Sequence, residues 1–314
     1  MELRDRIFVA GHTGMAGKAL VRRLSAEGYT SIITRTRSEL DLVDTASVRA
    51  FFAAERIGHV FLAAAKVGGI FANSTKPVEF LYDNLMIQNN VIRSAFENGV
   101  KKLCFLSSSC VYPRQCEQPM KEEYLLTGPL EPTNEGYALA KIAGMKFVEY
   151  YRREYGKSGI SIVPCNLYGT GDHFDLASAH VLSSLVKRFV DALDEKAASV
   201  TVWGSGTARR EFMHVDDAAR ACLFLMQHYD GDVPVNCGWG TDVSIRELAE
   251  TVRTAVGFAG AIEWDTSKPD GMPRKCVDTA RMDALGFRPE ITLAEGIRRT
   301  VEEYRALKKA GAVQ

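Results

Sequence analysis

IFVAGHTGMAG, residues 7–17, decides the fold of this 314-residue chain. Its first four residues are apolar and predict a buried strand, and Gly11, Gly14 and Gly17 follow where a helical pattern begins. A glycine triplet alone would also fit a flexible loop, but here a strand precedes it and a helix follows. Such a loop turns tightly, admits a pyrophosphate close to its backbone and lets the helix pack against the sheet. The stretch therefore predicts a dinucleotide site at a helix N-terminus.

Short apolar runs alternate with helical patterns through the first half of the chain. Strands are predicted at 7–10, 31–34, 59–63, 103–106 and 160–164, with helical segments at 20–24, 47–54, 82–97 and 137–151. This alternation predicts an α/β fold, a doubly wound parallel sheet of the Rossmann type covered by helices on both faces. Later segments are shorter and more mixed, which predicts a smaller, interleaved C-terminal substrate domain. We expect the nucleotide-binding domain at residues 1–165 plus about 214–235, and the substrate domain at about 166–213 and 236–314.

The composition narrows the class of protein. Lys plus Arg and Asp plus Glu number 39 each, so the charge gives no sign of a nucleic-acid or anionic-membrane partner. The seven cysteines form no CxxC pair and are odd in number, so we expect neither a disulfide framework nor a metal site. The N-terminus is too short and charged for a signal peptide, and no apolar run could span a bilayer. We therefore expect a cytoplasmic enzyme.

The residues at the end of the second predicted strand indicate which dinucleotide the chain binds. NAD enzymes usually carry an acidic residue there, which holds the ribose 2′-hydroxyl. This chain instead has Arg35 and Arg37, whose guanidinium groups suit a 2′-phosphate, although both could also be solvated surface residues. Asp41 and Leu42 follow, where the adenine would lie. We therefore expect NADP(H) as the cofactor.

A proton-transfer group is predicted where Tyr137 and Lys141 lie four residues apart on a helix. That spacing places both side chains on one helix face, where the ammonium would lower the pKa of the phenol. Such a pair can move a proton to or from a sugar oxygen. Ser108 follows the strand at 103–106, at the sheet edge that faces the ligand crevice. Considered by themselves, Tyr137 and Lys141 could be an exposed pair on a helix, and Ser108 could be a polar residue where a strand meets a loop.

Several longer segments are far more specific. They are AAAKVGGI at 63–70, SSCVYP at 108–113, EPTNE at 131–135, NLYG at 166–169, VWGSGT at 202–207, REFMHVDD at 210–217 and SKPDG at 267–271. On these segments the chain resembles the extended short-chain dehydrogenase/reductase (SDR) family, and within it the group of GDP-L-fucose synthases, also called GDP-4-keto-6-deoxy-D-mannose epimerase/reductases. The matching segments run almost the full length of the chain.

The resemblance implies two chemistries in one pocket. C3 and C5 of a GDP-linked 4-keto sugar would be epimerised and NADPH would reduce C4. Epimerisation needs a base and an acid on opposite faces of the ring, and Cys110 and His180 match that pair in the family. Considered alone, Cys110 would be a small packing residue and His180 a core or helix-terminal histidine. The resemblance also suggests a homodimer, through the helices near 82–97 and 137–151.

Further contacts follow from the same resemblance. The implied cofactor contacts are Gly11, Thr13, Gly14, Met15, Gly17, Arg35, Arg37, Asp41, Leu42, Ala64, Tyr137, Lys141, Pro164, Asn166, Leu167 and His180. The implied substrate contacts are Arg188, Trp203, Arg210 and Asp270, while Lys275 could join them or be a solvated lysine. Two positions depart from the family: Thr13 stands where an arginine often helps to hold the 2′-phosphate, and Ser107 stands where glycine is common.

Other functions remain open at this point. Reductases of the GDP-deoxyheptose and GDP-colitose pathways share much of the pattern. A sugar-nucleotide 4,6-dehydratase would need an acidic pair where Ser109 and Cys110 stand, and a 4-epimerase that keeps its NAD bound favours an acidic residue in place of Arg35 and Arg37. A non-catalytic NADP-binding regulator of the same fold is a further alternative, although such proteins commonly lose the tyrosine or lysine.

Overall fold

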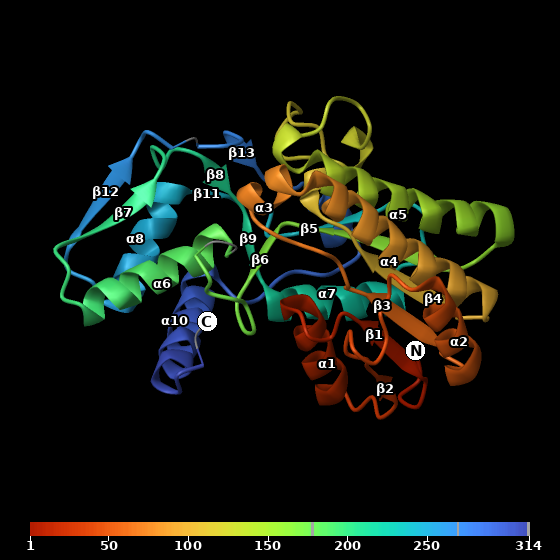
Figure 1. Ribbon diagram of the computed structural model, residues 1–314. Coiled ribbons are helices and arrows are strands. Elements are labelled where there is room, and N and C mark those ends of the chain that lie inside the picture. Colours follow the sequence, from red (N-terminus) through yellow and green to blue (C-terminus); the bar gives the residue numbers. More distant parts are fainter. Residues whose placement is uncertain (177–178, 269, 313–314) are drawn as a thin grey trace.

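A parallel six-stranded sheet forms the centre of the structure, a computed structural model that describes residues 1–176, 179–268 and 270–312 (Figure 1). Its strands lie in the order β2 (Ile32–Ile33), β1 (Ile7–Ala10), β3 (His59–Leu62), β4 (Lys102–Leu106), β5 (Gly159–Pro164) and β10 (Val235–Cys237). Every neighbouring pair is parallel. The predicted doubly wound Rossmann sheet is therefore confirmed.

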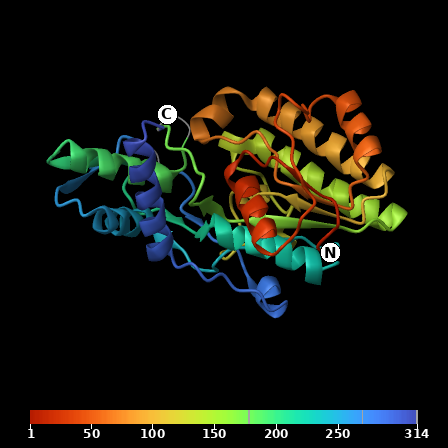
Figure 2. The ribbon, with the colours of Figure 1, turned by 90° about the horizontal axis from the view of Figure 1, so that it is seen from below.

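Helices cover both faces of this sheet. One face carries α1 (Met15–Ala26) and α7 (Val215–His228), which pack against each other, and the other carries α2 (Thr45–Glu55), α4 (Pro77–Glu97) and α5 (Glu135–Tyr155). Figure 2 shows the red α1 and the teal α7 together on one side, with α4 and α5 on the opposite side. The strands between them are almost wholly buried, because both of their faces are covered.

The strand order places a ligand crevice beside β1. The chain runs from β1 outward to β2, then returns to β3 on the other side of β1 and continues to β4, β5 and β10. In open parallel sheets a ligand binds at such a reversal, outside the carboxyl ends of the strands. The glycine loop follows β1, and Ser108 follows β4, so both lie at this edge.

The remaining elements build a second, smaller layer beside the sheet. Its apolar core joins α6 (Val181–Asp194), α8 (Ile245–Val256) and α10 (Leu293–Lys309) with the parallel pair β7 (Ser199–Trp203) and β12 (Ala261–Asp265). Short strands complete it: β6 (Asn166–Tyr168) pairs with β9 (Phe212–His214), and β8 (Arg209–Arg210) lies between β11 (Val243–Ser244) and β13 (Arg274–Lys275). Short helical segments are α3 (Ile70–Thr75), α9 (Ala280–Ala284), η1 (Ser109–Val111), η2 (Glu122–Tyr124) and η3 (Pro132–Asn134).

Several boundaries in the structure lie a few residues from those that the sequence predicts. The helix expected from 82 begins at Pro77, because proline is suited to the first helical position, where no N–H bond is needed. The domain boundary expected at about residue 235 falls inside β10, whose three residues all pair with β5. We therefore propose that the first domain extends to Cys237. Among the described residues, no helix is both long and apolar enough to cross a membrane.

Candidate active site

A cavity of about 520 Å³ lies at the crevice edge of the sheet. Its lining brings together all the residues that the sequence proposed for catalysis and for the cofactor: Gly11, Thr13, Gly14, Met15, Gly17, Arg35, Arg37, Asp41, Leu42, Ala64, Ser108, Cys110, Tyr137, Lys141, Pro164, Asn166, Leu167 and His180. They come from the segments that follow β1, β2, β3 and β4, from the end of β5 and from β6, and from the starts of α5 and α6. One cavity therefore spans from the glycine loop to the predicted proton-transfer groups.

The glycine loop is as tight as its sequence predicts. Gly11 has a φ of +86°, and a Cβ there would lie 2.6 Å from the backbone of Ala64. A Cβ on Gly17 would lie 2.1 Å from the carbonyl oxygen of Gly11, so α1 could not approach β1 as closely. Gly14 begins α1 without a side-chain cap. The first N–H groups of α1 are thus left to face an anion in the cavity.

Arg35 and Arg37 differ in how firmly they are held. Arg35 donates to a carboxylate oxygen of Glu55 at 2.6 Å and lies over the ring of Phe51, at 5.3 Å from its centroid. Its side chain is 35% exposed. Arg37 is 80% exposed and its one ion pair among the described residues, to Asp41, is long at 3.5 Å. Arg37 therefore has the guanidinium that is freer to meet a phosphate.

We expect Ala at both arginines to weaken NADPH binding at least roughly tenfold, because charge-assisted bonds to a phosphate are lost. NADH binding should change little, and Arg37→Ala alone should account for most of the loss. Titration of cofactor fluorescence measures both affinities, with Arg49→Ala on the exposed side of α2 as the charge-matched control. An equal loss for NADPH and NADH would show that neither arginine contacts the 2′-phosphate.

Tyr137, Ser108 and Lys141 form a connected group beside the end of β4. Tyr137 and Ser108 line the cavity close to each other. Lys141, on the same face of α5, is buried, donates to the carbonyl oxygen of Leu106 at 2.8 Å and lies 5.8 Å from the centroid of the Tyr137 ring. This is the arrangement that the four-residue spacing predicts.

The expected direction of the Tyr137 pKa is wrong. Burial raises the pKa of Tyr137 above its ordinary value and the nearby Cys110 adds to this, while the hydrogen bond with Ser108 acts in the opposite direction. Burial also lowers the pKa of Lys141 to about 7, which weakens its charge. Desolvation is the largest influence on the pKa of both groups. Tyr137 is therefore a protonated phenol, suited to donate a proton.

Cys110 lies in the same cavity with three polar neighbours. Its sulfur accepts from Asn134 Nδ2 at 3.1 Å and from Lys275 Nζ at 3.2 Å. Burial acts to raise the pKa of Cys110, but the charge of Lys275 and the hydrogen bonds from Ser108, Lys275 and Asn134 together hold it below its ordinary value. The thiolate is thus more accessible than that of an ordinary cysteine.

His180 lies at the N-terminus of α6 and lines the same cavity. Its ring lies 6.5 Å from the ring of His173. Although the residue keeps solvent-accessible surface, the surrounding atoms lower the pKa of its imidazole by desolvation, and Asp172 acts against this shift. This shift favours the neutral form of the imidazole.

The four expected substrate residues are all described, and none of them lines this cavity. Arg188 lies over the ring of Trp203, which is 62% exposed, at 5.9 Å from its centroid. Arg210 donates to the carbonyl oxygens of Arg209 and Met272, and Asp270 accepts from the backbone and side chain of Ser205 at 2.7 and 2.8 Å. They lie on the β7, β8 and β13 side of the structure, next to the segment that brings Lys275 into the cavity.

Two neighbours of Cys110 were not assigned to it from the sequence. Asn134 lies three residues before Tyr137, within the EPTNE segment. This position is the only feature of the sequence that points to a place in the site. For Lys275 the sequence allows two roles, a substrate contact or a solvated surface lysine. In the part of the chain that the structure describes, no group of three or more His, Cys, Asp or Glu residues could hold a metal ion.

Comparison with known proteins agrees with this geometry. The model of the NAD dependent epimerase/dehydratase family matches residues 7–238. The chain is 51% identical to GDP-L-fucose synthase 1 of Arabidopsis thaliana over 299 residues, which cover 95% of this chain and 93% of that protein.

Two solved structures are also similar. One is a GDP-6-OMe-4-keto-L-xylo-heptose reductase from Campylobacter jejuni, with a TM-score of 0.93 and 37% identity, covering 98% of this chain and 99% of the other. The second is a GDP-L-fucose synthetase from Naegleria fowleri bound to NADP, with a TM-score of 0.92 and 31% identity, covering 99% and 96%. The chain therefore belongs to the NAD dependent epimerase/dehydratase family, in the group of the GDP-L-fucose synthases.

Proposed function

We propose that this enzyme converts GDP-4-keto-6-deoxy-D-mannose to GDP-L-fucose, by epimerisation at C3 and C5 and NADPH-dependent reduction at C4. The observation that carries the proposal is the presence of two separate proton-transfer groups in one cavity. Ser108, Tyr137 and Lys141 form the first group, while Cys110 and His180 form the second. A simple reductase needs only the first group.

The cavity fits an NADP cofactor. The glycine loop leaves room for a pyrophosphate against backbone N–H groups, and Arg35 and Arg37 line the adjoining end of the cavity. Asp41 and Leu42 lie beside the two arginines, where an adenine would rest. When bound, NADPH supplies the hydride that reduces C4.

Reduction uses the protonated Tyr137. As the ketone oxygen gains negative charge, the Tyr137 hydroxyl donates its proton to that oxygen, and Ser108 holds the same oxygen by a second hydrogen bond. The raised pKa of Tyr137 keeps the proton available until the alkoxide forms. Lys141, fixed to the carbonyl oxygen of Leu106, orients the phenol and stabilises the charge that Tyr137 acquires.

Epimerisation uses Cys110 and His180. The thiolate of Cys110 removes the proton next to the ketone, and the C–H electron pair moves onto the ketone oxygen as an enolate. His180 returns a proton to the opposite face of the ring, which inverts the carbon centre. The GDP portion and the sugar are proposed to be held by Arg188 of α6, Trp203 of β7, Arg210 of β8 and Asp270, which precedes β13.

Analysis of the reaction product tests the proposed substrate. Incubation with GDP-4-keto-6-deoxy-D-mannose and NADPH should consume NADPH and yield GDP-L-fucose, as measured by mass and proton NMR. The alternative is a related GDP-4-keto deoxy sugar, which the likeness to the Campylobacter jejuni heptose reductase favours. Faster turnover of a GDP-4-keto heptose would establish that alternative. NADPH binding with no consumption for either sugar would instead indicate a regulator.

We also propose a homodimer, formed by the outer face of α4 and α5. Exposed apolar side chains gather there, with Val78 and Tyr82 on α4 and Leu139 and Tyr150 on α5. They repeat at helical spacings along one face of each helix, so two copies related by a twofold axis would bury them as four helices.

Charge placed on this face should separate the copies. We expect light scattering at micromolar concentration to give the dimer mass for the wild type, and the monomer mass for the double variant Tyr82→Glu and Leu139→Glu. Leu3→Glu is the control, because Leu3 is similarly exposed, at 53%, but lies outside the helical face. A wild-type monomer would contradict the proposed dimer.

The cellular location is part of the same proposal. All seven cysteines are free thiols and five of them are buried, which suits a reducing cytoplasm. The balanced charge gives no support for a nucleic-acid partner. We therefore propose a cytoplasmic enzyme whose partners are its cofactor, a GDP-sugar and a second copy of itself.

A further inference from the structure

Lys275 reaches Cys110 from a distant part of the chain. The two residues are 165 positions apart, and their Nζ and Sγ atoms lie 3.2 Å from each other. Within the described residues, Lys275 forms no ion pair with a carboxylate, unlike Lys66, which also lines the cavity and pairs with Glu79 and Asp83. The polar partner of the Lys275 ammonium is thus the sulfur of Cys110.

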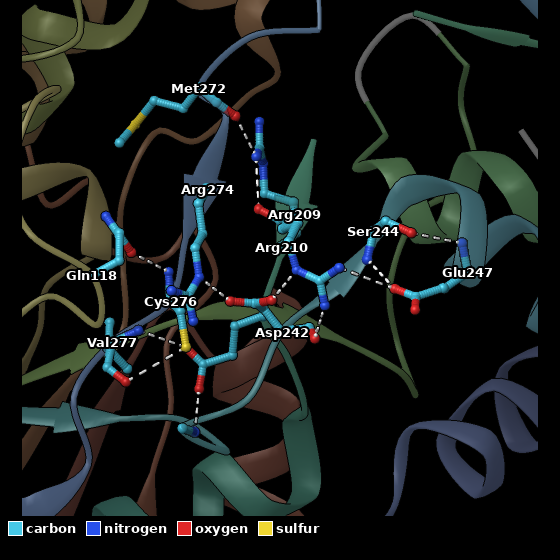
Figure 3. Close-up of polar contacts among 12 residues, drawn as sticks. Gln118, Arg209, Arg210, Asp242, Ser244, Glu247, Met272, Arg274, Cys276 and Val277 are labelled. Carbon is cyan, nitrogen blue, oxygen red and sulfur yellow. Dashed lines mark hydrogen bonds and ion pairs between the residues drawn. The ribbon is translucent and has the colours of Figure 1, made fainter. Parts of the chain in front are cut away.

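The strand that carries Lys275 is tied to its neighbour by a shared carboxylate. In β13, Lys275 lies in register with Arg210 of β8. Figure 3 shows Asp242 between the two strands, with one oxygen on Arg209 of β8 and the other on Arg274 of β13. Asp242 is almost wholly buried, and a buried carboxylate with two arginines fixes both strands more firmly than a solvated ion pair would.

The residues after Lys275 are also held on the other side. Cys276 donates its N–H to the side chain of Gln118 at 3.0 Å, as Figure 3 shows, and its carbonyl oxygen accepts from the backbone of Met120 at 2.7 Å. The buried Glu211 accepts from Val277 N at 2.8 Å and from Gly240 N at 2.7 Å. The segment is thus fixed both to the Rossmann layer and to the second layer, with the side chain of Lys275 directed at Cys110.

We propose that Lys275 is a positioning residue that holds Cys110 as the thiolate that acts as the base. An ammonium at this distance favours the charged form of a thiol over its neutral form. Asn134 supplies a second hydrogen bond to the same sulfur, and Ser108 and Tyr137 also lie close to it. This proposal rests on the proposed epimerisation and assigns the group that keeps Cys110 deprotonated, so that its sulfur is free to take the first proton.

The proton balance is simple. The thiolate of Cys110 takes the proton from carbon and becomes a neutral thiol, while the C–H electron pair moves to the ketone oxygen as an enolate. Lys275 keeps all of its protons throughout. When solvent later removes the proton from Cys110, the thiolate forms again beside the ammonium, ready for the second carbon centre.

The test compares Lys275→Met, Lys275→Gln and Lys275→Arg with wild type. The first readout is the rate at which iodoacetamide alkylates Cys110 in the enzyme without substrate, across a range of pH, with mass spectrometry to locate the label. Cys116, which is partly exposed and whose pKa is raised by burial, is the internal reference. Lys101→Met removes the same charge at a surface pair with Asp5 and is the control variant.

Near neutral pH, we expect both neutral variants to alkylate Cys110 at least about tenfold more slowly, since an opposite charge at this range shifts a pKa by about 1 to 3. Cys116 should not change, and Lys275→Arg should restore most of the rate. The second readout is exchange of the C3 and C5 protons of GDP-4-keto-6-deoxy-D-mannose with heavy water. This exchange should fall by a similar factor in the neutral variants.

The two readouts separate the possible failures. Unchanged pH dependence of Cys110 alkylation in Lys275→Met and Lys275→Gln would overturn the proposal. Slower alkylation with unchanged proton exchange would also overturn it, because Lys275 would then not support the base. Slower alkylation in an enzyme whose wild type exchanges no protons of this sugar would support the Lys275–Cys110 pair and show that the proposed substrate is wrong.

Discussion

Tyr137→Phe should nearly stop NADPH oxidation, by roughly 100- to 10,000-fold, the range that positioned proton donors supply. The variant keeps the ring but loses the hydroxyl that donates to the developing alkoxide. It should still exchange the C3 and C5 protons of GDP-4-keto-6-deoxy-D-mannose with heavy water, because Cys110 and His180 are intact. Absorbance of the NADPH band and proton NMR measure the two reactions on the same sample.

A conservative control is available on the same helix. Tyr155→Phe removes a hydroxyl at the exposed end of α5 and should leave both reactions unchanged. If Tyr137→Phe lost proton exchange together with reduction, Tyr137 would also support the enolate, and the two proton-transfer groups would not be separable.

Cys110→Ser should have the opposite effect. A serine hydroxyl is a far weaker base than a thiolate beside an ammonium, so proton exchange should fall by roughly 100-fold or more. Slow reduction of the ketone that has not been epimerised should persist and give a rhamnose-type product. Proton NMR in heavy water, with and without NADPH, records both outcomes.

Cys116→Ser is the matched control, because Cys116 is also partly exposed but lies outside the cavity lining. Among the described residues its sulfur forms one hydrogen bond, to the carbonyl oxygen of Pro113. Exchange in Cys110→Ser at the wild-type rate would show that Cys110 is a packing residue. The proposed division of roles between the two groups would then be wrong.

Local sequence patterns determined the parts of the site that local geometry controls. The strand at 7–10 and the glycine loop follow from a short apolar run and three glycines, because each position has its own steric requirement. Tyr137 and Lys141 share a helix face because a helix has a fixed repeat. Ser108 reaches the same cavity because parallel strands end at one edge of the sheet.

Long-range packing decided what these patterns could not. The pKa of Tyr137 is raised rather than lowered, since burial depends on the atoms that surround the pair and not on its spacing. Arg35 and Arg37 look equivalent in the sequence, yet Glu55, 20 residues beyond Arg35, pairs with Arg35 and not with Arg37. Both outcomes depend on residues that the fold brings close from elsewhere in the chain.

The contact between Lys275 and Cys110 shows this limit most clearly. No spacing rule joins residues 165 positions apart, and the lysine is placed by two strands, a buried carboxylate and a segment held by both layers of the fold. The sheet, the cofactor loop and the Tyr137–Lys141 pair could be predicted from the sequence, because they depend on local repeats. Only the tertiary structure decided which cation faces the thiol, because an ammonium acts on a sulfur through distance in space.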